Sequence, residues 1–288
     1  MIQGTKEWLA WRNEGIGSSD APIIMGVSPW TTPYQLWRQK LEIDPPKSET
    51  FAMARGKSLE DSIRARIDRE CGFNVVPDTA EHRELKWMRA SFDGINWSTK
   101  KLIEIKCGNR RDHEKAREGT IPVQYAPQLQ HLMEVAGPEF TEILYVSYCD
   151  QELLIVPVSR DDDYIAKLIQ KESEFMNCIR EFEAPELTED DYLDVDSEEW
   201  NALSKAWNGI VKEETDLLVR KEKLREKILD LANGKNIRGQ NIFVKQVTRK
   251  GTVEYMKIPE LKNCDLNKYR KPVTTHWTIR TKELSLEV

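Results

Sequence analysis

Residues 92–107, FDGINWSTKKLIEIKC, place two opposite charges on one face of an apolar, strand-like segment. Side chains two positions apart in a β-strand point to the same side, so Glu104 and Lys106 share one face and their apolar neighbours share the other. The run 86–93 also has strand character and ends at Asp93, and the turn NWSTKK follows it. The pattern predicts a β-hairpin that brings two carboxylates and a lysine close together.

The expected hairpin has a chemical consequence. If its strands pair, Ser91 and Asp93 meet Glu104 and Lys106 across the ladder. Two neighbouring carboxylates repel each other unless a cation lies between them, and hard oxygen ligands suit Mg²⁺ or Mn²⁺. A lysine beside the ion can orient or help to deprotonate the attacking water, or stabilise charge on a phosphoryl group. The hairpin therefore has the parts for metal-dependent phosphodiester hydrolysis, and a solvated hairpin with an ion pair is the alternative.

Helices and strands are expected to alternate through residues 1–185. Apolar spacing by threes and fours indicates helices, and alternation with a period of two indicates strands. This order predicts an α/β core with a mixed central sheet flanked by helices. Helices are expected at 5–13, 53–71, 122–136 and 161–183, and strands at 73–76, 86–93, 101–107, 141–149 and 152–158.

Two stretches near the N-terminus carry helix-start signals. In SSDAPIIMG, Ser18 or Ser19 is a candidate N-cap, and Pro22 suits the first helical turn. In TTPYQLWRQK, Thr32 is the candidate cap and Pro33 the first helical residue. We therefore expect a helix to begin at each position.

The C-terminal part of the chain has a different pattern. An acidic linker is expected at 186–199, followed by a heptad helix with a β-hairpin appendage at 200–288. Ten positions from 200 to 231 step by threes and fours, and eight of them are apolar, which is typical of a packing seam. Asn233 and Gly234 supply a helix stop. Strands are expected at 241–247 and 252–257, and TTHWTIR could add a third.

Charge and cysteine content limit the class of protein. The net charge is −6, but residues 181–199 hold ten acids and no Lys or Arg, so the rest of the chain carries +4. Residues 100–117 hold seven basic residues against three acids, so global acidity does not exclude DNA as a partner. The five cysteines are scattered without C-x-x-C spacing, which argues against a disulfide framework or a metal cluster. No apolar run is long enough to span a membrane and no signal peptide is evident, so we expect a cytoplasmic protein.

Five short motifs occur together in residues 6–183. In order they are G-I-G-S-S-D-A, R-G-K-S-L-E, S-F-D-G, I-E-I-K-C and Q-Y-A-P-Q-L-Q. This series resembles the YqaJ family of viral recombinases, which is related to phage lambda exonuclease and lies in the PD-(D/E)XK nuclease superfamily. The resemblance implies a restriction-endonuclease-like core, with residues 200–288 outside it.

The resemblance also implies a metal site. Asp93 and Glu104 would bind Mg²⁺ or Mn²⁺, as two ions, with the Ile105 carbonyl as a further ligand. Lys106 would position or activate the water. Glu60, in R-G-K-S-L-E, matches the acidic residue that adds to the metal site, although a boundary glutamate in solvent is the alternative.

A second set of residues matches the family's 5′-phosphate site. Arg12, Ser19 and Ser91 match phosphate contacts, and Gln128 matches a glutamine near the metal and the scissile phosphate. A helix start at Ser19 would favour an anion, although a plain N-cap is the alternative. Asp20 would repel a phosphate if turned inward, so we expect it to cap the helix or face outward.

The activity implied by the resemblance is that of a metal-dependent DNA exonuclease. It would act 5′→3′ on double-stranded ends and generate single strands for phage-type homologous recombination in a bacterial or phage-infected host cell. Implied partners are DNA ends, further copies of the chain in a ring and a single-strand annealing protein; no membrane is expected. The alternatives are an endonuclease of restriction or repair type and a non-catalytic DNA-binding or assembly protein. Phe92 stands where the superfamily has proline, which is a common variation. Phage lambda exonuclease has a further acid about ten residues before the metal-binding Asp, and depending on alignment that position here is Arg83 or Glu84.

Overall fold

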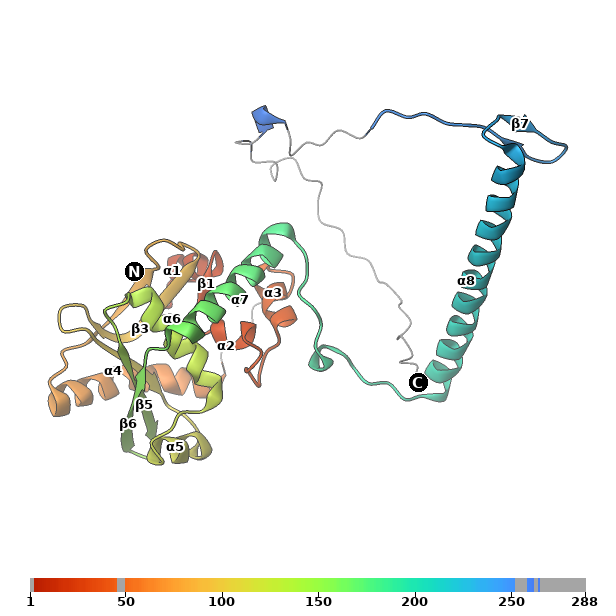
Figure 1. The fold of residues 1–288 in the computed structure, drawn as a ribbon. Helices are drawn as coiled ribbons and strands as arrows, with labels where there is room; N and C mark the ends of the chain where they lie inside the picture. Colours follow the sequence, from red (N-terminus) through yellow and green to blue (C-terminus); the bar gives the residue numbers. More distant parts are fainter. Residues whose placement is uncertain (1–2, 46–49, 252–257, 262–263, 265–288) are drawn as a thin grey trace. The chain divides into compact units, whose positions relative to one another are not determined.

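The computed structural model describes residues 3–45, 50–251, 258–261 and 264 (Figure 1). The chain divides into two compact units, Met1–Leu193 and Asp194–Val288. The predicted boundaries at 185, 186–199 and 200 stay predictions.

A six-stranded mixed sheet forms the centre of the first unit, as predicted. The order of its main path is β1-β3-β4-β5-β6, and β2 pairs with β3. The β1–β3 and β4–β5 pairs are parallel, and the β2–β3, β3–β4 and β5–β6 pairs are antiparallel. The strands are β1 (Ile16–Gly17), β2 (Val76–Glu81), β3 (Met88–Asn96), β4 (Lys101–Lys106), β5 (Glu142–Cys149) and β6 (Glu152–Ser159).

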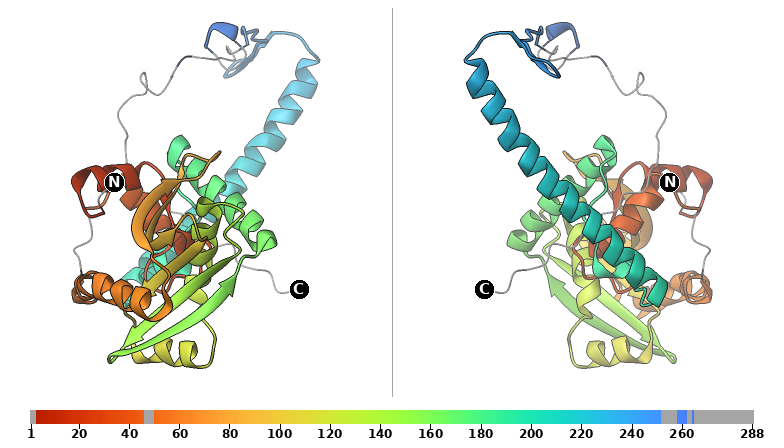
Figure 2. Two further views of the ribbon diagram at one scale, coloured as in Figure 1. Left: turned by 90° about the vertical axis from the view of Figure 1, so that its left-hand side faces the viewer. Right: turned by 90° about the vertical axis from the view of Figure 1, so that its right-hand side faces the viewer.

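Helices cover both faces of this sheet (Figure 1, Figure 2). On one face, α4 (Phe51–Cys71) packs Ile63 and Ile67 against apolar side chains of β4 and β5. On the other face, α6 (Ala126–Ala136) packs its apolar residues against β3 and β5. The side chains of β4 alternate between the two faces of the sheet, as predicted. Ile103 and Ile105 face α4, whereas Glu104 faces α6 and contacts Gln128 there.

Two N-terminal helices, α2 (Ala21–Ile24) and α3 (Pro33–Lys40), pack on α7 (Asp162–Glu181). The first helix, α1 (Lys6–Asn13), contacts β1. Thr32 caps α3 as predicted, since its hydroxyl accepts from the backbone N–H of Gln35. The expected cap at Ser18 or Ser19 is wrong, because α2 begins after Asp20.

Three further differences from the predicted elements appear. The strand expected at 73–76 lies instead at Val76–Glu81, because the buried Val75 belongs to the connection that packs on α4. The segment 122–136 begins as a 3₁₀ turn, and its α-helix starts at Ala126. The helix α5 (Arg110–Arg117) was not predicted; it lies against β5 and β6 (Figure 2).

Strand β3 has a gap along one edge. Strand β2 pairs with β3 from Arg89 to Ile95, so it occupies one whole edge. The opposite edge is shared by β1, which pairs at Met88 and Arg89, and β4, which pairs from Gly94 onward. Residues 90–93 therefore have no strand partner on that edge in the described structure, and this interval contains two predicted site residues.

The second unit contains the long helix α8 (Glu198–Ala232) and a short hairpin of β7 (Ile237–Arg238) and β8 (Phe243–Val244). Asn233 ends α8 in the left-handed conformation, with φ 47°, as the predicted stop requires. The expected strand at 252–257 and the one in TTHWTIR lie outside the described residues. Among the described helices, none is both long enough and apolar enough to cross a membrane.

Candidate active site

The predicted catalytic residues gather where β3, β4 and α6 meet. Lys106 Nζ donates to Glu104 Oε1 at 2.7 Å, and Gln128 Nε2 donates to the same oxygen at 2.6 Å. Asp93 Oδ2 accepts the backbone N–H of Ile105 at 2.8 Å, which fixes the first carboxylate beside the second strand. The structure thus brings Asp93, Glu104, Lys106 and Gln128 into one cluster.

Burial and like charge perturb the two carboxylates. Burial, and to a smaller extent the nearby charge of Asp93, raises the pKa of Glu104 to about 8. Burial also raises the pKa of Asp93, although Lys106 and the Ile105 N–H oppose the change. Burial alone would lower the pKa of Lys106, but the Glu104 and Asp93 charges outweigh it and the pKa is raised. The ammonium form of Lys106 is therefore held between two carboxylates.

One oxygen of this cluster has no partner. Glu104 Oε2 is buried and makes no hydrogen bond within the described part of the chain, because both donors reach Oε1. An unsatisfied buried carboxylate oxygen is costly, and a cation would relieve both the burial and the repulsion from Asp93. The donor set fits a hard divalent cation, since Mg²⁺ is commonly held by one or two carboxylates with water and substrate phosphate as the remaining ligands.

Glu60 approaches this cluster from α4. Burial first, and then the Asp93 charge, raises the pKa of Glu60. One helical turn later, Arg64 Nε donates to the Asp93 carbonyl at 2.6 Å. In the described part of the chain, no three His, Cys, Asp or Glu side chains are close enough together to form a metal-binding group. A role for Glu60 in metal binding therefore stays a prediction.

The β3–β4 ladder is shorter than expected. It runs from Asn96↔Lys101 to Gly94↔Ile103, so Ser91 does not pair across to Lys106. Ser91 lies in the β3 edge gap, where its Oγ accepts from Trp8 Nε1 at 2.9 Å. The expected contact of Ser91 with the catalytic strand is wrong, because β3 diverges from β4 and pairs with β1 at its start.

Ser91 belongs instead to an N-terminal cluster with two other predicted phosphate contacts. The Arg12 guanidinium lies 5.2 Å above the Trp8 ring, and it donates to the exposed Ser19 hydroxyl. Arg12, Ser19 and Ser91 are thus joined through Trp8. Because Ser91 and Asp93 are two residues apart on β3, this cluster adjoins the carboxylates. Gln128 contacts Glu104, and no hydrogen bond to the N-terminal cluster is present among its described contacts.

Asp20 takes a different position from the one expected. Its side chain is buried, forms an ion pair with Lys40 at 2.7 Å and accepts the Gly17 N–H at 2.9 Å. It makes no capping hydrogen bond to α2. Burial would raise the Asp20 pKa, but the charges of Lys40 and Arg12 hold it below the usual 3.8. The expectation that it would cap or face outward is wrong, because α3 brings Lys40 to neutralise it.

Lys40→Met should destabilise the protein by about 3–5 kcal/mol, because it leaves Asp20 charged and unpaired in the interior. Lys40 also donates to the Gly15 and Arg12 carbonyls at 2.7 and 3.1 Å, so its loss disturbs the turn that carries Ser19. Since the Asp20 pKa is depressed, the stability from this pair should be full above about pH 3.8 and fall as the pH drops through the lower folded value. Chemical denaturation at several pH values measures both effects. An unfolding free energy equal to that of the parent at neutral pH would contradict the assignment.

Several residues that contact the candidate site were not predicted from the sequence. Arg64 was within reach, because it follows Glu60 by four residues and shares its helix face. Tyr125 is half-buried, and its ring lies 5.3 Å from Lys106 Nζ. Trp8 and Lys40 carried no local signal, since their partners lie far away in the sequence.

The fold and the cluster together define a class. A mixed sheet flanked by helices, with carboxylates on adjoining strands and a lysine two residues after the second, is the architecture of PD-(D/E)XK nucleases. A crystal structure of an alkaline exonuclease from Laribacter hongkongensis is similar, with a TM-score of 0.53 and 28% identity over 62% of this chain and 94% of that one. The same enzyme in complex with dAMP gives a TM-score of 0.52 and 27% identity over the same shares of the two chains.

The family follows from sequence comparison. Residues 7–139 match the model of the YqaJ-like viral recombinase domain. The uncharacterized protein YqaJ of Bacillus subtilis (strain 168) is 31% identical over 175 residues, 59% of this chain and 55% of that protein. The chain therefore spans little more than half the length of this relative. The predicted resemblance and fold class are confirmed.

Proposed function

We propose that this chain is a divalent-metal-dependent deoxyribonuclease that degrades double-stranded DNA from its ends, 5′→3′, and so produces single strands for phage-type homologous recombination. The observation that carries the proposal is the buried Glu104 oxygen without a hydrogen-bond partner, in a carboxylate that also feels the charge of Asp93. The similarity to an alkaline exonuclease supports the same class of activity.

Asp93 and Glu104 would hold the metal, with the Ile105 carbonyl and Glu60 as further ligands. Bound Mg²⁺ or Mn²⁺, as two ions, would supply activation of water and neutralise charge on the phosphate. Gln128 donates to Glu104 Oε1, which leaves Oε2 as the oxygen that would bind the ion. Arg64 holds the Asp93 backbone from α4. These two residues position the ligands.

Lys106 serves as a hydrogen-bond donor at the reacting phosphate. In the structure the Glu104 and Asp93 charges raise the pKa of Lys106. An ammonium at this position would orient the water and stabilise charge on the phosphate. The ring of Tyr125 lies 5.3 Å from Nζ and limits its movement. An in-line displacement of the 3′-oxygen would then proceed beside a fixed positive charge.

The N-terminal cluster would bind the 5′-phosphate. Arg12 and Lys40 carry two positive charges against the one negative charge of Asp20. The Arg12 guanidinium and the hydroxyls of Ser19 and Ser91 can donate hydrogen bonds to phosphate oxygens. Because α2 has only four residues, we assign the hydrogen bonds to the phosphate to these side chains and not to the start of the helix. This cluster adjoins the carboxylates, as attack one nucleotide from an end requires.

Assembly and partners extend the proposal. The seam predicted on α8 is exposed in its own unit at Trp200, Leu203, Ile210 and Leu217, among others. Burial of such a row against other chains would be favourable. This supports a homo-oligomer, which the family resemblance suggests is a ring, and docking of a single-strand annealing protein in the cytoplasm of a bacterial host.

Digestion of linear and covalently closed circular duplex DNA separates the candidate functions. We expect mononucleotides to accumulate from linear DNA with Mg²⁺, while circular DNA stays intact and EDTA stops the reaction. Cleavage of the circle would support the endonuclease of restriction or repair type. An absence of hydrolysis on both DNAs would favour the non-catalytic DNA-binding protein.

A further inference from the structure

A cavity of about 360 Å³ lies beside the candidate active site, and none of its lining residues belongs to the proposed catalytic or 5′-phosphate sets. It lies between the loop that follows α2, helix α5 and the 3₁₀ turn before α6. Its lining includes Trp30, Asn109, Arg111, Asp112, Lys115 and Gln124.

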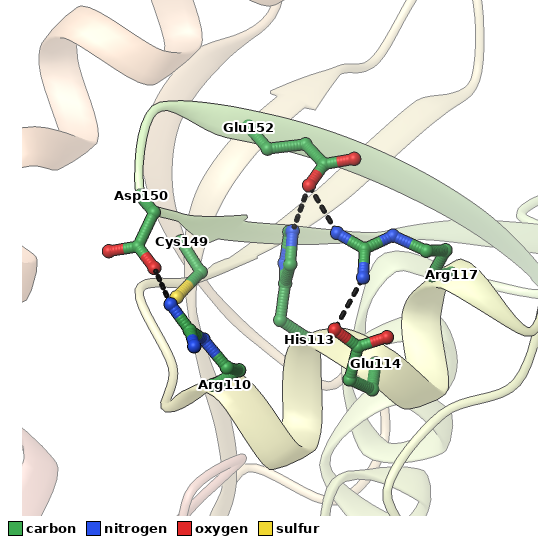
Figure 3. A pocket seen from close by; sticks show the side chains of 7 residues that line it. All are labelled: Arg110, His113, Glu114, Arg117, Cys149, Asp150 and Glu152. Atoms are coloured by element: carbon green, nitrogen blue, oxygen red, sulfur yellow. Dashed lines mark hydrogen bonds and ion pairs between the residues drawn. The ribbon is translucent and has the colours of Figure 1, made fainter.

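The two cations of this cavity lack the ion pairs that neighbouring cations have. Arg111 is exposed and Lys115 half-buried, and neither has an ion-pair partner among the described residues. A second cavity, of about 300 Å³, lies on α5 and the tip of the β5–β6 hairpin (Figure 3). There Arg110 pairs with Asp150, and Arg117 pairs with Glu114 and Glu152 (Figure 3). The first cavity therefore has uncompensated positive charge, whereas the cations of the second are neutralised.

The negative side chain in the first cavity is turned to other partners. Asp112 is buried, and its Oδ2 accepts from Asn109 Nδ2 at 3.3 Å and from the Tyr125 hydroxyl at 3.5 Å. Its backbone N–H is capped by Asn109 Oδ1 at 2.9 Å. Because these donors are neutral, Asp112 still counts against the cations, and the lining has two formal positive charges and one negative. The excess is positive, which favours an anion.

The indole of Trp30 is unusually accessible for its size. It is 64% exposed, and the described structure shows no ring contact or hydrogen bond to its side chain. Its backbone N–H is held by Ser28 Oγ at 3.3 Å, which anchors the loop that carries it. An exposed tryptophan face beside two cations is the combination that binds a base and its phosphates.

The cavity is close to the reacting centre. Its lining residue Asp112 accepts a hydrogen bond from the Tyr125 hydroxyl. The ring of the same tyrosine lies 5.3 Å from Lys106 Nζ. Asn109 follows Lys106 by three residues. The side chain of Tyr125 therefore contacts both a lining residue of the cavity and the candidate catalytic lysine.

We propose that this cavity binds an unpaired nucleotide of the DNA substrate, with its base stacked on Trp30 and its phosphates on Arg111 and Lys115. The proposal rests on the proposed nuclease function for its choice of ligand. Inside a duplex both faces of each base are covered by neighbours, so stacking on an indole selects an unpaired base. The cavity would hold the strand separated from the one that is hydrolysed, or the frayed end, next to the catalytic cluster.

Binding of a short single strand tests this assignment without hydrolysis. The probe is an oligothymidylate of about eight nucleotides with a 5′-hydroxyl and a 3′ fluorophore, measured by anisotropy in EDTA. Trp30→Ala should raise its Kd roughly tenfold, whereas Trp30→Phe should retain most of the affinity because it keeps a ring. Arg111→Ala should weaken binding and reduce the slope of log Kd against log salt by about 0.7.

Arg110→Ala is the matched control, since it removes the same charge from the adjacent position on α5. It should leave the Kd within about twofold, because Arg110 lines the other cavity and already pairs with Asp150. Equal losses at Arg110 and Arg111, a Trp30→Ala protein that binds as tightly as the parent, or a parent that does not bind the probe would each overturn the proposal.

The failure of this inference is distinguishable from that of the proposed function. If the parent hydrolyses linear DNA but Trp30→Ala leaves binding unchanged, the cavity assignment falls alone. If the parent hydrolyses nothing but loses the oligonucleotide on Trp30→Ala, the nuclease function falls and the cavity remains a nucleotide site.

Discussion

Glu104→Gln should lower the rate of nucleotide release from linear duplex DNA by about a thousandfold or more, with little change in the folded structure. The substitution keeps the shape of the side chain and an oxygen that Lys106 can donate to, but it removes the negative charge at the oxygen that has no partner. A catalytic metal contributes several kcal/mol to transition-state stabilisation, and each 1.4 kcal/mol is about tenfold in rate. Initial rates of release of acid-soluble nucleotides measure the effect.

Glu142→Gln is a suitable control for this prediction. Glu142 is exposed at the start of β5, so the same chemical change there should leave the rate unaltered. Thermal melting of both variants excludes misfolding. A Glu104→Gln protein that keeps more than about a tenth of the parent rate would show that this carboxylate is not a metal ligand.

Arg12→Ala should abolish a preference for 5′-phosphorylated ends. The parent is expected to degrade ends with a 5′-phosphate faster than ends with a 5′-hydroxyl, and the variant should degrade both at the slower rate. A bond between a guanidinium and a phosphate contributes about 1.5–3 kcal/mol, so the loss on phosphorylated ends should be roughly 10- to 100-fold. Parallel digestion of the same duplex with either end measures it.

The exposed Arg69 on α4 provides the matched control, since Arg69→Ala removes the same charge at a site with no described partner. It should keep the preference of the parent. If Arg12→Ala still discriminated between the two ends, the phosphate would be bound elsewhere, and the N-terminal cluster would be structural.

The parts of the site that were predicted correctly are local in sequence. Glu104 and Lys106 contact each other because they are two residues apart on one strand, and this spacing is visible in LIEIKC. The helix at 53–71 was predicted in the same way, from helical spacing, and its Ile63 and Ile67 pack on the sheet. Short elements gave no comparable signal: β1 has only two residues, and the eight residues of α5 are almost all polar.

The parts that were missed depend on packing between distant segments. Trp8 meets Ser91 across 83 positions, and β3 diverges from β4 because β1 pairs with its other end. The burial of Asp20 depends on Lys40, twenty residues later, which only the docking of α3 brings close. No local pattern encodes such contacts, so a side chain that the sequence favours as a cap becomes an interior ion pair.

The central claim is that the Asp93 and Glu104 pair forms a metal centre that hydrolyses DNA from an end. Its most direct test is the release of acid-soluble nucleotides from linear duplex DNA, by the parent with Mg²⁺, by the parent with EDTA and by Glu104→Gln with Mg²⁺. We expect release in the first reaction alone. Equal release in all three, or none in the first, would contradict the claim.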